Sequence, residues 1–548
     1  MPPYAPAAMR VTLLSPDGPA LDALVPGAER VDIGAGPDVV LLAGPTDAVP
    51  VGLLVEITAA VEQGAVLLCL GAPAGAGWEA ITGVAPGDVV PGGEVYATVA
   101  ARTPATARLT GEFPVAGTFR WLEPVGETTT LLTSSIRFAH RPALVQRRLG
   151  SGRVVTCGFG PDAIAHRSSG NDELRRVLQR LLEPPPTVVE RQLGVGVVGY
   201  GPYGGMGSLH GTAATATDGL ALTSVVDPVD ERRKAAEAEF PGVAAHETLD
   251  GLLADDAVDI VVVATPPNTH AGLALACLRA GKHVVVEKPL CITTAEADLL
   301  LQAAADADRM LTVHQNRRWD ADFRALRRAV DAGLLGELFN VETFVGGFEH
   351  PCRAWHSELS VSGGAIYDWG SHHLDWILLL MPGTPATVTT TRHKRVWHDI
   401  TNDDQVRVRL AWDDGREAEF LQSDIAGVRR PKLYVQGTEG TVAGHYRPVV
   451  TETVEHVHGY RRHESHHAEA PVELSLARYE RGYGLTHTTL PPLPAEPWPF
   501  HRNVADHLLL GEPLEVDAGD VRRVIGVLEA AQRSGDEGGR PIALGHPG

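Results

Sequence analysis

The feature that most constrains the fold is an apolar run that ends in a glycine-rich turn. Residues 194–198 read Gly-Val-Gly-Val-Val, and the chain continues as Gly199-Tyr200-Gly201-Pro202-Tyr203-Gly204. A short, continuously apolar run indicates a strand buried on both faces, as in a parallel sheet. Glycines then allow a sharp turn into a helix, which we expect from Ser208. This pattern predicts an α/β domain with the turn at the carboxyl edge of its sheet.

A second apolar run places an amine at the same edge. Residues 284–289 read Val-Val-Val-Glu-Lys-Pro, so Lys288 follows directly on a predicted strand. In an open parallel sheet the carboxyl ends of the strands face one crevice, where ligands bind. We therefore expect Lys288 beside the glycine turn, an arrangement that suggests redox chemistry on a small molecule.

Length and composition limit the alternatives. A chain of 548 residues is too long for one core and predicts roughly two to four domains. The net charge of −21 argues against binding to nucleic acid or to anionic membranes. The five cysteines are scattered without a CxxC pair, which fits a reducing compartment and offers no zinc-site spacing. The chain has neither a signal-peptide pattern nor an apolar run of about eighteen residues, so we expect a cytoplasmic protein.

Strand and helix patterns divide the chain into domains. Residues 1–183 alternate strands and helices, which predicts a first α/β domain, with strands at 9–16, 38–44, 65–70 and 152–158 and helices at 51–63 and 171–182. The three prolines at 184–186 favour an extended spacer, so we place a linker at 184–191.

A second α/β domain is predicted at 192–314, and a third domain at 315–548. The second has predicted strands at 194–198, 220–226, 260–264, 283–286 and 311–314, with helices at 271–280 and 294–307. In the third, residues 405–412 and 416–421 alternate apolar and polar side chains around Asp413-Asp414-Gly415, which indicates an antiparallel meander with one solvated face. We expect a final helix at 521–534 and a polar loop in the His-rich stretch 456–467.

The glycine turn has the context of a dinucleotide site. Gly199, Gly201 and Gly204 match the pattern GxGxxG, and Gly207 is an alternative third glycine because the turn carries extra residues. The next predicted strand ends at Asp227, which can accept hydrogen bonds from ribose hydroxyls and repel a 2′-phosphate. We therefore predict NAD as cofactor, with NADP possible. The alternative is a structural turn that binds no nucleotide.

A carboxylate and an imidazole stand four residues apart further along the chain. In a helix, Asp368 and His372 would share one face. Oxidation of an alcohol needs a base for the hydroxyl proton, and a histidine titrates near neutrality. We expect His372 to be this base, Asp368 to orient it or to bind a substrate hydroxyl, and Lys288 to hold the reacting oxygen. The alternative is an ordinary helix cap with a surface histidine.

Taken together, these marks resemble the glucose–fructose oxidoreductase and inositol dehydrogenase family (Gfo/Idh/MocA) over residues 192 to about 545. The marks are the glycine turn, Thr265-Pro266-Pro267-Asn268-Thr269-His270, Glu287-Lys288-Pro289 and Gly363-Gly364-x-x-x-Asp368-x-Gly370-x-His372. The resemblance implies a Rossmann domain, a domain with a large, mainly antiparallel open sheet, and a homo-oligomer. It also implies NAD(P)-dependent oxidation of a sugar or polyol, with Lys288, Asp368 and His372 as the catalytic residues. Thr265, Pro266, Asn268, His270 and Glu287 would then lie at the cofactor, and Arg317 and Arg318 near the substrate.

Residues 1–183 resemble, more faintly, the ThuA-like group of the class I glutamine-amidotransferase-like fold. The resemblance is carried by residues 61–71 and 149–155. An amidotransferase needs a cysteine on a sharp elbow with a histidine partner. Cys69 has Leu68 and Leu70 beside it, so we expect a buried apolar thiol, and His140 and His166 have no assigned place. Two roles stay open: a degenerate partner, or a module that processes a keto-sugar.

Three other functions remain compatible with the sequence. The same residues serve an enzyme that oxidises its substrate transiently and regenerates the cofactor, as in elimination, epimerisation or glycoside cleavage. A non-catalytic sensor of nucleotide or sugar would need no base. A metal enzyme would have to use His456, His458, His463, His466 and His467, which show no ligand spacing, so we expect no metal site.

Overall fold

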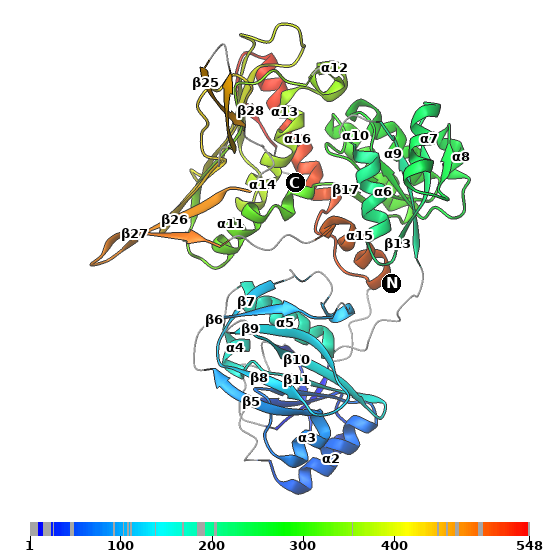
Figure 1. Ribbon diagram of the computed structural model, residues 1–548, viewed down its shortest axis with the longest axis vertical. Helices are drawn as coiled ribbons and strands as arrows, with labels where there is room; N and C mark the ends of the chain where they lie inside the picture. Colours follow the sequence, from blue (N-terminus) through cyan, green and yellow to red (C-terminus); the bar gives the residue numbers. More distant parts are fainter. Residues whose placement is uncertain are drawn as a thin grey trace. The chain divides into compact units, whose positions relative to one another are not determined.

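The computed structural model divides the chain into two compact units, Met1–Val188 and Val189–Gly548 (Figure 1). The structure describes residues 9–14, 24–25, 27–43, 49–90, 94–101, 103–106, 109, 112–136, 139–166, 169–182, 192–201, 205–352, 354–446, 449–455, 459–465, 471–491 and 497–545. The predicted linker at 184–191 lies outside the described residues.

The first unit is built on a nine-stranded sheet with a parallel half and an antiparallel half. The parallel half has the order β2-β1-β3-β4-β11, with strands Glu29–Arg30, Arg10–Leu13, Val39–Ala43, Val66–Leu70 and Gly152–Cys157. This order is that of flavodoxin-like doubly wound folds. The main helices are α2 (Val51–Glu62), α3 (Ala76–Thr82), α4 (Pro161–Ala165) and α5 (Ser169–Leu182). The strands and helices predicted for this unit are confirmed.

The antiparallel half of this sheet was missed by the sequence patterns. It continues from β11 through β10, β9, β6 and β7, which span Ala139–Leu149, Thr129–Ile136, Glu94–Val99 and Glu112–Ala116. A separate pair is formed by β5 (Val84–Val90) and β8 (Phe119–Pro124). Strand β10 shifts its register after Pro142, which interrupts the two-residue periodicity that signals a strand.

The second unit begins with a six-stranded, fully parallel sheet in the order β14-β13-β12-β15-β16-β17. This is the strand order of a Rossmann domain. The strands are Ala244–His246, Leu220–Val226, Leu193–Val198, Ile260–Val263, His283–Val286 and Leu311–Val313. The helices are α6 (Met206–Ala216), α7 (Asp230–Glu239), α8 (Leu249–Leu253), α9 (His270–Arg279) and α10 (Thr294–Ala307) (Figure 1). Of these strands only the short β14 was not predicted, and no ranges were predicted for α7 and α8.

A nine-stranded sheet follows, in the order β27-β26-β23-β22-β18-β21-β20-β19-β28. Its neighbours pair antiparallel except for β18 and β21. From β18 to β23 the strands are Leu338–Gly346, Thr387–His393, Gln405–Ala411, Glu417–Ser423, Leu433–Gly437 and Gly440–His445, and β26, β27 and β28 are Glu473–Glu480, Gly484–Leu490 and Ile542–Ala543. The predicted mainly antiparallel sheet and the β20–β21 hairpin are confirmed.

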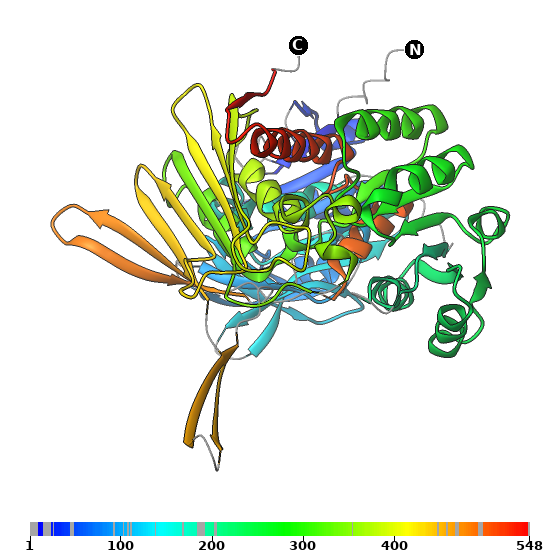
Figure 2. The ribbon, with the colours of Figure 1, turned by 90° about the horizontal axis from the view of Figure 1, so that it is seen from above.

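Helices cover one face of this sheet and share a hydrophobic core with the Rossmann sheet. They are α11 (Ala321–Asp331), α14 (Gly370–Leu380) and α16 (Ala518–Asp536), and Figure 2 shows α16, in dark red, alongside the strands. The shorter α12 (Leu359–Ser362), α13 (Ala365–Asp368) and α15 (Pro499–Leu510) complete the set. One continuous core therefore holds the glycine turn and the segment of Asp368 and His372 in fixed positions.

The His-rich stretch differs from the predicted polar loop. Residues Gly459–Ser465 form β25, which pairs antiparallel with β24 (Val449–Glu455) as a separate two-stranded sheet (Figure 2). Residues 456–458 and 466–470 lie outside the described part. Among the helices that the structure describes, none has the length and apolar character required to span a bilayer.

Candidate active site

The glycine turn brings the start of α6 against the end of β12. Gly199 has φ +100°, and a Cβ there would lie 2.5 Å from the Ala264 carbonyl oxygen, so only glycine fits. A Cβ on Gly207, in the first turn of α6, would lie 2.6 Å from the Gly199 carbonyl oxygen. Gly207 thus occupies the position of close helix–turn packing, while Gly204 lies outside the described residues.

The turn has the features that an anionic pyrophosphate requires. Helix α6 starts immediately after it, so unpaired amides and the positive end of the helix dipole face the turn. A Cβ on Gly201 would approach only the side chain of Arg232, at 3.6 Å, which leaves room for a ligand close to the backbone. These residues fit a dinucleotide, which Gly199, Gly201 and the start of α6 would hold.

Asp227 lies at the end of β13 and binds the turn itself. Its Oδ2 accepts from the Tyr200 amide at 2.9 Å and its Oδ1 from the Val229 amide at 2.9 Å. The guanidinium of Arg232 lies 3.5 Å from Oδ2, and Asp227 is only 2% exposed. The carboxylate is therefore at the predicted place, and any ribose hydroxyl would share it with Arg232.

The loop after β15 is held by a buried histidine. His270 Nδ1 lies 2.7 Å from the Pro289 carbonyl oxygen and its Nε2 lies 2.7 Å from the Thr265 carbonyl oxygen. His270 is fully buried, whereas Asn268 is exposed. Both ring nitrogens lie against backbone carbonyl oxygens, so His270 joins this loop to the segment of Lys288, and its place at the cofactor stays a prediction. Thr265 and Thr269 bridge the same loop through their hydroxyls, at 2.7 Å.

Lys288 and Asp368 form an ion pair. The Lys288 Nζ donates to Asp368 Oδ1 at 2.7 Å and to the Asp368 carbonyl oxygen at 3.2 Å. Both side chains stay partly open, with 23% and 30% of their surface exposed. Burial opposes ionisation of Asp368, but the Lys288 ammonium outweighs it and lowers the pKa of this carboxyl. An ammonium and a carboxylate are thus presented together at a site that solvent reaches.

His372 has a different partner from the one predicted. Asp368 ends α13 and His372 lies in α14, with Trp369 between the two helices. The His372 Nδ1 lies 3.0 Å from Gln315 Oε1, while the Gln315 Nε2 donates to the Ser371 carbonyl oxygen at 3.0 Å. Because its amide nitrogen already donates, Gln315 presents an acceptor to the imidazole. The proton of neutral His372 is therefore on Nδ1, and Nε2 keeps its lone pair.

The environment also keeps His372 neutral. Burial lowers its pKa well below the usual value, and the positive charges of Lys288 and Arg317 lower it further. The residue is only 4% exposed. A neutral imidazole with a fixed lone pair can accept a proton from a bound hydroxyl.

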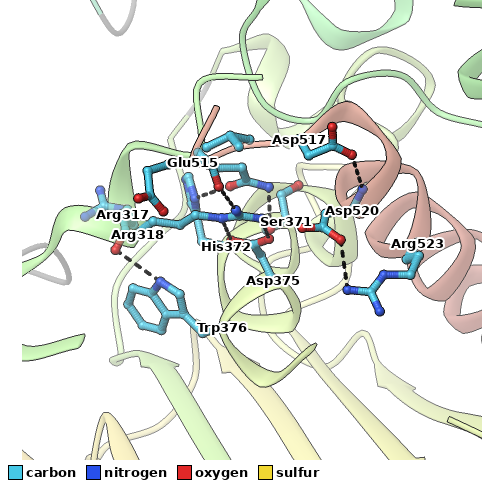
Figure 3. A network of polar contacts seen from close by, with 12 residues as sticks. Arg317, Arg318, Ser371, His372, Asp375, Trp376, Glu515, Asp517, Asp520 and Arg523 are labelled. Carbon is cyan, nitrogen blue, oxygen red and sulfur yellow. Dashed lines mark hydrogen bonds and ion pairs between the residues drawn. The ribbon is translucent and has the colours of Figure 1, made fainter. Parts of the chain in front are cut away.

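The two arginines predicted near the substrate have different roles. Figure 3 shows the buried Arg318 guanidinium between Asp375 and Glu515. It donates to both carboxylate oxygens of Asp375, at 2.8 and 2.6 Å, and to the Glu515 carbonyl oxygen. Arg318 therefore joins α14 to the segment before α16 and is not directed at a substrate. Arg317 packs over the Trp369 ring at 4.8 Å, and its charge lowers the pKa of both Asp368 and His372.

Sequence reasoning gave no role to three residues of this region. Gln315 orients His372, as described above. Burial lowers the pKa of His356, and the charges of Asp368 and Lys288 act on the same ring. Burial, followed by the charges of Asp368 and Asp404, raises the pKa of Asp424 to about 7. None of them lies in a recognisable motif, so only the tertiary structure brings them to the site.

Comparison with known proteins places the second unit in a family. Residues 193–315 match the family described as "Oxidoreductase family, NAD-binding Rossmann fold", and residues 323–443 match the GFO/IDH/MocA C-terminal domain. The 1,5-anhydro-D-fructose reductase of Ensifer adhaerens is 30% identical over 234 residues, which are 41% of this chain and 70% of that protein. The chain belongs to the Gfo/Idh/MocA family.

Two further relatives match a larger share of the chain. The scyllo-inositol 2-dehydrogenase (NADP(+)) of Bacillus subtilis is 28% identical over 354 residues, which are 64% of this chain and 96% of that enzyme. The crystal structure of an NAD-binding protein from Listeria innocua matches with a TM-score of 0.55 and 28% identity, over 64% of this chain and 97% of that one. This Gfo/Idh/MocA protein is accordingly an NAD(P)-dependent oxidoreductase.

Proposed function

We propose that the enzyme moves a hydride between a hydroxyl-bearing carbon of a sugar or polyol and NAD(P). The observation that carries the proposal is the Lys288–Asp368 pair, at 2.7 Å, in the same region as an imidazole whose free lone pair is fixed by Gln315. Sugars and polyols offer adjacent hydroxyls, which suit a site that presents a donor, an acceptor and a base together. The names of two relatives, an inositol dehydrogenase and an anhydrofructose reductase, support this substrate class.

Each residue has a defined task in this proposal. A bound nicotinamide supplies the acceptor for the hydride. The Lys288 Nζ donates to the reacting oxygen and stabilises the negative charge that develops on it. His372 takes the hydroxyl proton at Nε2. Asp368 holds the Lys288 ammonium and accepts from a second substrate hydroxyl.

Asp227 favours NAD over NADP in this scheme, because a carboxylate repels a 2′-phosphate. Arg232 lies 3.5 Å from that carboxylate and moderates the repulsion, which agrees with some use of NADP. In this proposal, the charges of Asp227 and Arg232 determine the choice between NAD and NADP.

For the first unit we propose a ThuA-like module without a catalytic thiol. The parallel order β2-β1-β3-β4-β11 supports this assignment. Cys69 is the fourth of the five residues of β4 and has no exposed surface, and burial raises the pKa of its thiol far above the ordinary value. Such a thiol is unreactive, so Cys69 has no nucleophilic role in this proposal.

Lys288→Met tests the proposed function. This variant keeps the length of the side chain but removes its charge, so turnover of a reactive polyol should fall about 100-fold or more while NAD still binds. Lys234→Met, at an exposed position of α7, is the matched control and should behave like the wild type. NAD affinity is measured by calorimetry, and turnover by the absorbance of reduced nicotinamide. Undiminished turnover in Lys288→Met would reject the role of this lysine.

A further inference from the structure

Three buried histidines meet beside Glu287, the residue that precedes Lys288. His210 comes from α6, His314 follows β17, and His501 comes from α15. Their exposed fractions are 0%, 3% and 5%. One ring nitrogen from each lies within 4.8 Å of the other two. The sequence patterns did not reveal this group, because its members are far apart in the sequence.

Hydrogen bonds fix the tautomers of two of these rings. His210 Nε2 lies 2.9 Å from Glu287 Oε1, and His314 Nδ1 lies 2.7 Å from the same oxygen. An ionised carboxylate only accepts, so both of these nitrogens carry protons. The lone pairs are then on His210 Nδ1 and His314 Nε2. His501 Nε2 therefore donates to His210 Nδ1 at 2.9 Å, and binding of a metal ion at this nitrogen would require the other tautomer of His501.

Burial acts on the titration of the groups in this cluster. It lowers the pKa of His210 and lowers that of His501 well below the usual value. Burial alone would raise the pKa of Glu287, but the imidazoles of His314 and His210 hold it well below its ordinary value. Neutral imidazoles backed by a carboxylate are the usual arrangement around a bound metal ion.

We propose that His210, His314 and His501 form a binding site for a divalent transition-metal ion, foremost Zn²⁺, with Glu287 behind two of the rings. The ring centroids lie 4.6, 5.1 and 5.5 Å apart, and the ring planes are inclined by 60°, 58° and 63° to one another. Zinc binds imidazole nitrogen at about 2.0–2.1 Å, which places ligand nitrogens about 3.3 Å apart in a tetrahedral site. The three ring nitrogens, which lie within 4.8 Å of one another, would have to adjust toward this spacing when the ion binds.

A metal ion here would act on the position of Lys288. It would join α6, the end of β17 and α15, which belong to different parts of the second unit. Glu287 Oε2 also accepts from the Lys288 amide, at 3.1 Å, so the ion would stiffen the segment that carries the lysine. This proposal stands on the geometry of the cluster and does not depend on the reaction of the enzyme. It also departs from the sequence-based expectation that no metal site exists.

Zinc binding is tested on the full chain after removal of metal with a chelator. The His-rich stretch is a second possible source of zinc affinity, so the reference protein carries glutamine in place of His456, His458, His463, His466 and His467. We expect it to bind one zinc ion per chain in a calorimetric titration. His501→Gln in this reference should lower the affinity at least about 100-fold, since it removes a direct ligand. His487→Gln, at an exposed position of β27, is the matched control and should change nothing.

Two further measurements distinguish the loss of a zinc ligand from misfolding of a variant. Circular dichroism and the thermal midpoint of each metal-free variant show whether the fold is retained. X-ray absorption at the zinc edge of the reference protein should report three imidazole nitrogens, independently of any variant of the cluster. The proposal is overturned if the reference protein binds no zinc, if His501→Gln binds it as well as the reference does, or if fewer than three imidazoles surround the ion. The cluster would then be a set of hydrogen-bonded neutral histidines.

Discussion

Gln315→Leu removes the side chain that fixes the proton on His372, and its effect follows from the hydrogen bonds around it. The Gln315 Oε1 accepts from His372 Nδ1 at 3.0 Å in a place where both residues are buried. With leucine, the tautomer that has a free Nε2 must leave a buried donor unpaired. An unpaired buried polar group costs about 1–3 kcal/mol. The imidazole then favours the tautomer with the proton on Nε2, which cannot accept the substrate proton.

The expected loss of rate follows from this cost. At about 1.4 kcal/mol per factor of ten, kcat/KM should fall about 5- to 150-fold. Gln315 is a positioning residue, so the affinity for NAD should not change. The assay records the initial rate of nicotinamide reduction with a reactive polyol, together with the calorimetric affinity for NAD.

Gln315→Glu separates orientation from packing. The carboxylate still accepts from Nδ1, so turnover on the pH plateau should stay within about tenfold of the wild type. Its negative charge raises the pKa of His372 from the depressed value that burial and Lys288 impose. Because His372 accepts a proton only when neutral, the acid limb of kcat/KM should move to higher pH. Wild-type kcat/KM in Gln315→Leu, or an unmoved limb in Gln315→Glu, would refute the reasoning.

Two further predictions concern stability. Arg318→Met leaves the buried Asp375 without its partner and should lower the free energy of unfolding in urea by about 3–5 kcal/mol. The double variant Arg318→Met/Asp375→Leu should largely restore this free energy. A higher KM at unchanged stability would instead make Arg318 a substrate ligand. Burial raises the pKa of Asp424 to about 7, so its contribution to stability is full below about pH 4 and is lost as the pH rises through about 7. Asp424→Asn should therefore raise the thermal midpoint more at pH 8 than at pH 5, and an equal gain at both pH values would contradict this linkage.

The parallel sheets could be predicted from the sequence because their strands are buried on both faces. Strand β12 and the last three residues of β16 are continuously apolar, and a glycine or a polar residue follows each, so their ends are visible. The antiparallel strands of the first unit carry no such signal. Strand β10 contains His140, Arg141 and Pro142, and its register shift hides the alternation. Local sequence therefore indicated half of that sheet and missed the other half.

Site residues could be predicted from the sequence where they follow a strand or belong to a motif. Lys288 and Asp368 could be named, but their direct pairing could not, since it joins residues 80 positions apart. The expected contact between Asp368 and His372 rested on one continuous helix, whereas Asp368 ends α13 and His372 lies in α14. The Lys288 ammonium is charged and lies within hydrogen-bonding distance, so it binds Asp368 instead. His372 is left to Gln315, a residue whose role depends entirely on tertiary structure.

Glu287 and Lys288, the two residues that follow β16, are neighbours with different tasks. Both residues follow the last residue of β16, and they contact different groups: Glu287 binds His210 and His314, while Lys288 pairs with Asp368. A buried carboxylate is costly unless its oxygens are satisfied, and Glu287 accepts from two imidazoles and from the Lys288 amide. The histidine cluster thus makes the inward carboxylate tolerable, and the fixed carboxylate in turn positions the backbone from which the lysine extends.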